Sequence, residues 1–411
     1  MEQLAINGGT PVREKPLSYG HQYIDEEDIA AVTAVLKSDF LTCGPQIGAL
    51  EKKLCDLTGA KYAVVCANGT AALHIAVQAA GLKEGDELIT TPMTFAASAN
   101  CALYVGARPV FADIDPDTWN IDPEKIRAAV TDKTKAIVAV DYTGQAVRLD
   151  ELKEIAAKAG ACLIEDAAHA IGTLYKGRPI GSIADMTTFS FHPIKTVTGG
   201  EGGAVLTDDE GLYKKLLLFR SHGITRDPSL MERVNKGNDG GSEIFAGEYG
   251  SDCPWYYEQV ALGENYRMTD MQAALISSQL DKLQRFKERR KEIVDRYNEA
   301  FGGQPGLIIQ KEIEESDTAR HLYVLRFDTK TLGLSRKEIF RRLWAEGIHG
   351  NVNYIPVYRH PYYEALGYEK GLCPVAESLY EEIISLPLYY GLTDGDVDDV
   401  IRAVYKVIGK N

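Results

Sequence analysis

Short apolar runs alternate with helical patterns through the first half of the chain, between residues 62 and 208. The short runs are rich in β-branched residues, whereas the stretches between them repeat apolar residues every three or four positions. This alternation is typical of parallel strands joined by crossover helices, so it predicts a wide α/β sheet. We expect strands at Tyr62–Cys66, Glu87–Thr91, Pro109–Asp113, Ala136–Asp141, Cys162–Glu165, Thr187–Phe191 and Ala204–Thr207.

One crossover helix can be bounded at both ends. Asp150 precedes the sequence ELKEIAAKA and is expected to be its N-cap, because a short polar side chain can accept a hydrogen bond from the first turn. Gly160 follows the last turn, where a left-handed C-cap favours glycine. The pattern predicts a helix between these two residues.

The sequence pattern changes after residue 220. Residues 221–263 hold seven glycines with little periodicity, which predicts a long surface loop of the kind that is usually functional. From Thr269 to Phe301 a helical pattern continues for some thirty residues. We expect this helix to form the connection to a second domain.

The C-terminal residues predict a smaller α/β unit. The strand patterns HLYVLRF and ISLPLYY occur with helical patterns at Ser335–Glu346 and Asp394–Val407. We therefore expect a large domain at residues 1–265, a connecting helix at 266–300 and a small C-terminal domain at 301–411.

Composition narrows the class of protein. The chain has 411 residues, 45% of them hydrophobic, with 59 acidic against 45 basic residues and a net charge of −14. A nucleic-acid partner would require a basic face, so none is expected. The seven cysteines are scattered without CxxC spacing, which favours reduced thiols in the cytoplasm over disulfides or a metal site. There is no secretory pattern and no apolar stretch long enough for a membrane span.

A candidate anion site follows the first predicted strand. Ala67, Asn68, Gly69 and Thr70 open the helical pattern TAALHIAVQAAG, and the free backbone N–H groups of a helix start can bind a phosphate. An ordinary strand-to-helix turn explains this fragment equally well.

Two further candidate groups stand at strand ends. In LIEDAAHA, Glu165 and Asp166 end an apolar strand, where the active-site groups of open α/β sheets collect, although such a carboxylate is more often a helix cap. In TTFSFHPIKTVTGGEGG, Ser190 and then Lys195 follow a strand and precede a glycine-rich turn. Taken alone, a lysine beside such a turn is usually a solvated surface charge.

Together these groups match the needs of pyridoxal phosphate (PLP) chemistry. A lysine binds this cofactor as an imine and afterwards moves a proton, and a carboxylate keeps the pyridine nitrogen protonated so that the ring can accept electrons. Helix-start amides and a hydroxyl can hold the phosphate. The chain supplies all of these groups and therefore predicts a PLP enzyme.

Several motifs resemble the DegT/StrS aminotransferases of sugar biosynthesis. They are NGTAAL, TTPMTFAASAN, EDAAHA, SFHPIKTVTGGEGG, LFRSHGI and ENYRMTDMQAAL, and the resemblance extends from about Tyr19 to Val407. It implies the fold of the fold type I PLP-dependent transferases: a large α/β domain with a mostly parallel sheet between helices, and a smaller C-terminal α/β domain.

The resemblance also implies roles for residues around the cofactor ring. Lys195 would bind PLP, Asp166 would pair with the ring nitrogen and His169 would lie near the ring hydroxyl. Phe95 would stack on the ring. Simple core packing of Phe95 and a structural role for His169 are the alternatives.

The same resemblance assigns the phosphate contacts. The backbone at Thr70 and Ala71, with the Ser190 hydroxyl, would hold the phosphate. Asn265 in ENYRMTD would reach the phosphate bound to a neighbouring subunit. The resemblance therefore implies a homodimer with shared active sites.

Two sets of motifs bear on the substrate. VDYTGQAVRLDEL and NVNYIPVYRHPYY resemble family members of pseudaminic-acid biosynthesis, which use L-glutamate to aminate C4 of a UDP-linked 4-keto-6-deoxy-N-acetylhexosamine. LAINGGTPVR resembles cyclitol and antibiotic-sugar members, so a 3-keto-sugar or cyclitol substrate remains an alternative. By resemblance, the sugar nucleotide would contact Tyr19, Leu41, Thr42, Tyr354 and Tyr358, although the last two tyrosines can equally pack between domains.

A different functional class also remains open, namely a PLP-binding regulator without turnover. The intact set of Lys195, Asp166 and Ser190 favours an enzyme. A yellow protein that bleaches with L-glutamate would be a transaminase, whereas colour without bleaching would indicate a regulator.

Overall fold

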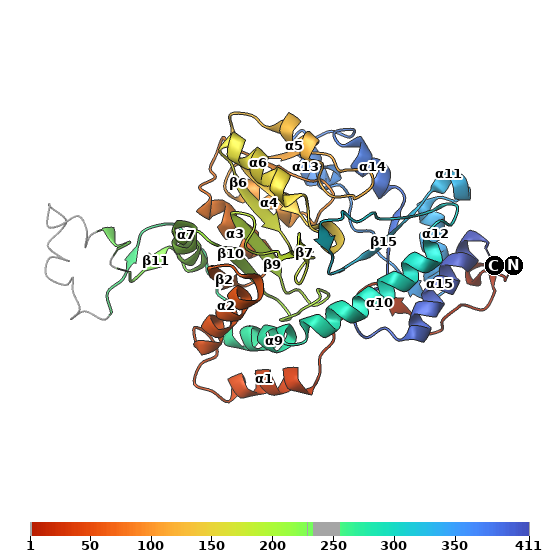
Figure 1. The fold of residues 1–411 in the computed structure, drawn as a ribbon, viewed down its shortest axis with the longest axis horizontal. Coiled ribbons are helices and arrows are strands. Elements are labelled where there is room, and N and C mark those ends of the chain that lie inside the picture. The colour runs from red at the N-terminus through yellow and green to blue at the C-terminus, as the bar shows by residue number, and fades with distance from the viewer. Residues whose placement is uncertain (1, 228, 233–254, 411) are drawn as a thin grey trace.

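A seven-stranded sheet forms the centre of the computed structural model, which describes residues 2–227, 229–232 and 255–410 (Figure 1). Its strands are β2 Tyr62–Cys66, β3 Glu87–Thr90, β4 Arg108–Phe111, β5 Thr134–Val140, β6 Cys162–Asp166, β9 Met186–Ser190 and β10 Gly203–Thr207. Their order across the sheet is β2-β10-β9-β6-β5-β3-β4. All seven predicted strands are present, with ends displaced by at most two residues.

The sheet is mostly parallel, as predicted. Neighbouring strands pair in parallel except around β10, which runs antiparallel to both β2 and β9. Every residue of β10 is buried, and nearly all of β5 and β6 are buried too. Strands covered on both faces carry continuous apolar runs, which is why the sequence showed no polar alternation.

Helices cover both faces of the sheet. Successive residues of β2 alternate between two cores: Val65 packs with Leu50 and Leu152, whereas Val64 packs with Leu73 and Leu216. The helices that supply these residues and their neighbours are α2 Pro45–Thr58, α3 Gly69–Ala79, α4 Ala97–Tyr104, α5 Pro123–Ala129, α6 Leu149–Ala159 and α7 Glu210–Arg220. This layered arrangement confirms the predicted α/β fold.

The predicted N-cap of α6 is wrong by two residues. The helix begins at Leu149 with Arg148 as its N-cap, so Asp150 lies in the first turn. There its carboxylate accepts a hydrogen bond from Lys176 Nζ at 2.6 Å, a contact with a distant turn that local sequence does not reveal. Gly160 has φ 63° and caps the other end, as predicted.

The long helical pattern after Thr269 forms two helices, not the single one expected. They are α9 Asp270–Leu280 and α10 Leu283–Phe301. At the break between them, the buried ammonium of Lys282 pairs with Asp25 and Asp28 at the start of α1 Glu26–Leu36. In Figure 1, α10 runs from the sheet to a second lobe.

The second lobe has its own sheet and core. Strands β13 Leu307–Ile309, β15 Tyr323–Phe327 and β17 Ile383–Leu386 form an antiparallel sheet, flanked by α12 Arg336–Ala345 and α15 Asp394–Ile408. These elements confirm the strand and helix patterns expected in the C-terminal residues.

The N-terminal arm packs on this second lobe. Strand β1 Leu17–Ser18 pairs in parallel with β16 Ile348–His349, and Leu17 belongs to the core of the lobe. The fully buried carboxylate of Glu346 accepts hydrogen bonds from the backbone N–H groups of Ala5 and Val12. The two ends of the chain accordingly lie together in Figure 1. The domain divisions at residues 265 and 300 stay predictions.

Part of the predicted surface loop at residues 221–263 lies outside the described residues. At its two ends, β11 Ile224–Thr225 pairs with β12 Glu258–Gln259. The other short elements are η1 Ala5–Asn7, η2 Tyr142–Gly144, β7 Leu174–Tyr175, β8 Arg178–Pro179, β14 Ser316–Asp317, α11 Thr329–Leu332, η3 Val357–Arg359, α13 Pro361–Ala365 and α14 Pro374–Tyr380. Within the described part of the chain, no helix is both long and apolar enough to cross a membrane.

Candidate active site

A cavity of about 610 Å³ lies at the carboxyl ends of β6 and β9. The start of α3, the segment before α4 and residues of the second lobe complete its wall. The predicted site residues that line it are Tyr19, Thr70, Phe95, Asp166, His169, Ser190, Lys195 and Tyr354. The fold therefore brings together groups that are up to 335 positions apart in the sequence, as Tyr19 and Tyr354 are.

Lys195 lies in the turn that follows β9. Its backbone N–H donates to the His192 carbonyl at 2.9 Å, which fixes the turn. Burial lowers the pKa of the Lys195 ammonium to about 8, while the negative charge of Asp166 acts in the opposite direction. A lysine with this pKa can lose its proton near neutral pH, so it can act as a nucleophile and as a base.

Asp166 ends β6 and is almost completely buried, with 4% of its surface exposed. Its Oδ2 accepts a hydrogen bond from the Ser98 hydroxyl at 2.6 Å, and its Oδ1 accepts one from the Ala168 backbone N–H at 3.2 Å. Burial raises the pKa of this carboxyl, whereas these two hydrogen bonds and the charge of Lys195 lower it. A carboxylate held in place by these hydrogen bonds can bind a cationic ring nitrogen.

The start of α3 and the Ser190 hydroxyl form an anion-binding corner. Asn68 is the N-cap, and its side chain accepts the Ala71 N–H at 2.8 Å. The amides of Gly69 and Thr70 precede the first intrahelical hydrogen bond and so are available to an anion. A Cβ placed on Gly69 would come within 2.9 Å of Ser190 Cβ, which shows how closely the two sides of the corner approach. Ala71 does not line the cavity and its amide is used by the cap.

His169 and Tyr354 join the two lobes across the cavity. His169 Nε2 lies 3.0 Å from the Tyr354 hydroxyl, and the two rings stack at 6.1 Å with an angle of 18°. Burial and the charge of Lys195 hold the pKa of His169 well below its usual value, so the ring is neutral. Within the described residues, its buried Nδ1 has no hydrogen-bond partner and can take one from a bound group.

Phe95 reaches into the same cavity. Phe95 is 62% exposed although Thr94 before it is buried, and its ring lies 6.4 Å from that of Tyr354. An aromatic ring at the wall of this cavity can stack on a planar cofactor.

Besides Ala71, four predicted residues do not line the cavity of their own chain. Tyr358 is fully buried; its hydroxyl donates to Glu377 Oε1 at 2.8 Å and accepts the Cys373 N–H at 3.1 Å, so it packs inside the protein. Leu41, Thr42 and Asn265 lie on the surface.

Several residues of the cavity wall were not predicted from the sequence. His321 and Asn353 line it, and each has a buried polar atom, Nδ1 and Oδ1, without a hydrogen-bond partner among the described residues. Thr94 and Ser98 line it as well. All four are polar residues within the motifs HLYVLRF, NVNYIPVY and TTPMTFAASAN, and their position in these motifs could have indicated them as site residues.

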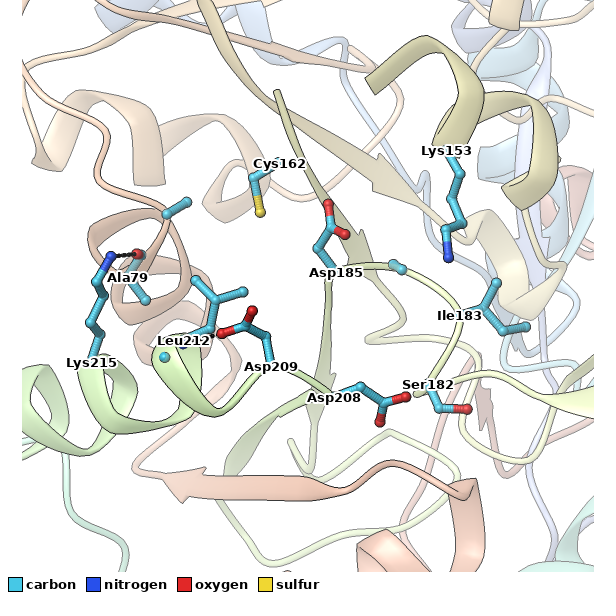
Figure 2. Close-up of a pocket in the computed structure, with 13 residues that line it drawn as sticks. Ala79, Lys153, Cys162, Ser182, Ile183, Asp185, Asp208, Asp209, Leu212 and Lys215 are labelled. Atoms are coloured by element: carbon cyan, nitrogen blue, oxygen red, sulfur yellow. Dashed lines mark hydrogen bonds between the residues drawn. The ribbon is translucent and has the colours of Figure 1, made fainter. Parts of the chain in front are cut away.

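A second cavity, of about 660 Å³, lies at the amino ends of β6 and β9 (Figure 2). Its carboxylates are occupied by backbone N–H groups: Asp185 accepts from Leu163 at 2.8 Å and Asp209 accepts from Leu212 at 2.8 Å. Lys215 donates to the carbonyl of Ala79, as Figure 2 shows. These polar groups stabilise strand and helix ends, so the larger volume does not make this the active site.

Comparison with known proteins identifies the family. Residues 22–405 match the model of the DegT/DnrJ/EryC1/StrS aminotransferase family. The chain belongs to this family. It is 42% identical over 394 residues to the spore coat polysaccharide biosynthesis protein SpsC of Bacillus subtilis, with 95% of this chain and 97% of SpsC covered.

Solved structures agree with this assignment. Helicobacter pylori PseC, an aminotransferase involved in the biosynthesis of pseudoaminic acid, matches with a TM-score of 0.85 and 32% identity over 96% of this chain and all of PseC. DesI, solved in the presence of its TDP-sugar product, matches with a TM-score of 0.85 and 31% identity over 98% of this chain and 96% of DesI.

These findings confirm the predicted family, fold and cofactor. The protein is a PLP-dependent sugar aminotransferase of fold type I. An enzyme is therefore favoured over the alternative of a regulator without turnover.

Proposed function

We propose that this enzyme transfers the amino group of L-glutamate to C4 of a UDP-linked 4-keto-6-deoxy-N-acetylhexosamine. The observation that carries the proposal is one cavity in which Lys195, Asp166 and the anion-binding corner at Ser190 lie together. The 32% identity to PseC over nearly the whole chain supports the sugar, and the likeness to DesI supports a nucleotide-linked substrate.

The residues present fit PLP. Bound PLP would supply an electron-accepting ring for the amino transfer. Lys195 would bind the cofactor through Nζ and then move a proton between substrate and cofactor. Asp166 would accept a hydrogen bond from the ring nitrogen, with Phe95 on the face of the ring and His169 at the ring hydroxyl. The free Nδ1 of His169 and the buried carboxylate of Asp166 are the observations that support this orientation.

The phosphate would lie in the corner between α3 and β9. There the amides of Gly69 and Thr70 and the Ser190 hydroxyl would bind its oxygens, whereas the amide of Ala71 already donates to the Asn68 side chain. The protein has a net charge of −14, so its grip on phosphate must come from such local donors.

The sugar nucleotide would approach from the second lobe. Tyr19 and Tyr354 line that side of the cavity. His321 Nδ1 and Asn353 Oδ1, which have no hydrogen-bond partner among the described residues, offer hydrogen bonds to sugar hydroxyls.

The functional unit would be a homodimer with shared sites. Asn265, Leu41 and Thr42 are exposed and absent from the cavity wall of their own chain, which suits residues that complete the site of a second copy. We place the enzyme in the cytoplasm because the six described cysteines are free thiols, the seventh, Cys253, lying outside the described residues.

Product analysis tests the substrate. UDP-linked 4-keto sugars would be generated in situ from UDP-N-acetylglucosamine, with dTDP-linked 3-keto and 4-keto sugars and free cyclitol ketones in parallel. The UDP-linked 4-keto sugar should give the amino sugar with the highest kcat/KM. If a 3-keto sugar or cyclitol ketone is preferred tenfold, about 1.4 kcal/mol of transition-state stabilisation, the substrate proposal is wrong and the alternative replaces it.

A separate experiment tests the proposed amino donor. Adding L-glutamate without a sugar should bleach the visible band of the bound cofactor. Bleaching with glutamine but not glutamate would contradict the proposed donor.

A further inference from the structure

The Ser98 hydroxyl is directed at the carboxylate of Asp166. Ser98 Oγ lies 2.6 Å from Asp166 Oδ2, and the two residues are only 1% and 4% exposed. An ionised carboxylate is only an acceptor, so the serine must donate. At this depth water cannot easily replace the lost donor if the hydroxyl is removed.

Thr94 extends this contact by one hydroxyl. Thr94 Oγ1 lies 2.7 Å from Ser98 Oγ, and Thr94 is 3% exposed. A hydroxyl has one proton, and that of Ser98 is used on Asp166, so the Ser98 oxygen accepts the proton of Thr94. The result is a chain of donors from Thr94 through Ser98 to Asp166, in which each hydrogen bond strengthens the next.

The same short segment carries Phe95. Thr94 and Ser98 flank this residue at the start of α4, and the Ser98 backbone N–H donates to the Phe95 carbonyl at 3.2 Å. The hydroxyl chain and the aromatic ring are therefore parts of one rigid turn. That turn and Asp166 line the same cavity.

We propose that Thr94 and Ser98 are positioning residues, which fix the plane of the Asp166 carboxylate so that it stays directed at the pyridine nitrogen of PLP. This inference rests on the proposed role of Asp166. The hydrogen bond from Ser98 also opposes the rise in the pKa of Asp166 that burial causes. It thereby favours the ionised carboxylate that a protonated pyridine requires.

The test removes each hydroxyl against a matched control. The variants are Ser98→Ala and Thr94→Val, which lose a hydroxyl of the chain, and Thr94→Ser, which keeps it. The control is Thr90→Val: the Thr90 hydroxyl is fully buried and donates to the Val138 carbonyl at 2.9 Å, away from Asp166. Two quantities would be measured on the folded proteins, namely the Kd for PLP and the pH midpoint of the visible absorption band.

The Ser98→Ala variant should bind PLP more weakly, by up to about tenfold, because a carboxylate that is no longer held in place must be ordered when the ring nitrogen binds. Its absorption midpoint should move to higher pH, because a less firmly held ring proton withdraws fewer electrons from the link to the lysine. Thr94→Val should change both quantities in the same direction by a smaller amount. Thr94→Ser and Thr90→Val should match the wild type.

Asp166→Asn serves as the reference that separates two kinds of failure. If it weakens PLP binding while Ser98→Ala and Thr94→Val both behave like Thr90→Val, the hydroxyl chain has no such role. If Asp166→Asn itself binds PLP like the wild type with an unchanged band, the proposed role of Asp166 fails, and this inference fails with it. Thr94→Val preserves side-chain volume, so the comparison remains available even if Ser98→Ala does not fold.

Discussion

Asp166 and Lys195 act on each other's ionisation across the cavity. The negative charge of Asp166 opposes the fall in the pKa of Lys195 that burial causes, and the positive charge of Lys195 opposes the rise in the pKa of Asp166. The neighbouring parallel strands β6 and β9 produce this arrangement, because each places its carboxyl end at the same edge of the sheet. As a result, Lys195 can react near neutral pH, and Asp166 beside it can bind a cation.

The first prediction concerns the reaction of the cofactor-free enzyme with PLP. Only the neutral amine of Lys195 is a nucleophile, so the rate should rise with pH and level off above about 8. In Asp166→Asn the midpoint should move to lower pH, since the charge that supports the ammonium is gone. Stopped-flow absorbance measures both. A rate that keeps rising towards pH 10 in the wild type would contradict the burial of this lysine.

The second prediction concerns shared sites. Asn265→Ala and Lys195→Ala should each be inactive or severely impaired alone, but mixed dimers should regain activity because one of their two sites has both residues intact. The measurement is activity after the two variants are unfolded and refolded together. A mixture of Lys195→Ala with wild type is the control for subunit exchange. Proven mixed dimers without activity would rule out sharing through Asn265.

The third prediction concerns Glu346, which holds the N-terminal arm. Its buried carboxylate also pairs with Lys406 Nζ at 2.8 Å, so Glu346→Ala removes the nearer carboxylate from this nearly buried ammonium and leaves it with Glu2, 4.0 Å away. The free energy of unfolding should fall by about 3 to 5 kcal/mol in urea titrations. The KM for the sugar should rise as well, because the arm leads directly to Tyr19. The exposed Glu292→Ala should stay within about 0.5 kcal/mol of the wild type; equal stability of both variants would show that the arm is not held in this way.

The fourth prediction concerns a buried acid pair next to Asp166. Asp141 and Glu165 are fully buried and coupled, and burial raises the pKa of Glu165 to about 7 and that of Asp141 well above its usual value. The folded state therefore binds more protons than the unfolded state, so stability should fall as pH rises from about 5 to 7. Glu165→Gln should flatten this dependence in urea titrations at several pH values. The exposed Glu314→Gln should leave the pH dependence as in the wild type. An unchanged slope in Glu165→Gln would contradict the raised pKa of Glu165.

The sequence was sufficient to predict those features of the fold that depend on the local pattern of apolar and polar residues. The strand before Asp166 begins as an apolar run, and β9 is buried up to Ser190 although it carries Thr187 and Thr188. The ends of these strands fix where polar groups leave the sheet. Gly160 was identifiable because its left-handed conformation has a strong residue preference.

Contacts between distant segments were not predictable in the same way. The break at Lys282 depends on carboxylates of α1, and the burial of Tyr358 depends on Glu377 and Cys373. The role of Ser98 is visible only when α4 lies against β6. A single sequence contains no signal for these pairings, because nothing in local periodicity specifies which segments meet.

The most direct test of the account is the identity of the lysine that binds the cofactor. Borohydride would reduce the cofactor–lysine link in the holoenzyme to a stable amine, and peptide mapping would locate the pyridoxyl group. Lys195→Ala should abolish turnover while the protein remains folded, since loss of proton transfer alone costs roughly 10²- to 10⁴-fold. The account predicts the label on Lys195. A label on any other lysine, with Lys195 unmodified, would contradict it.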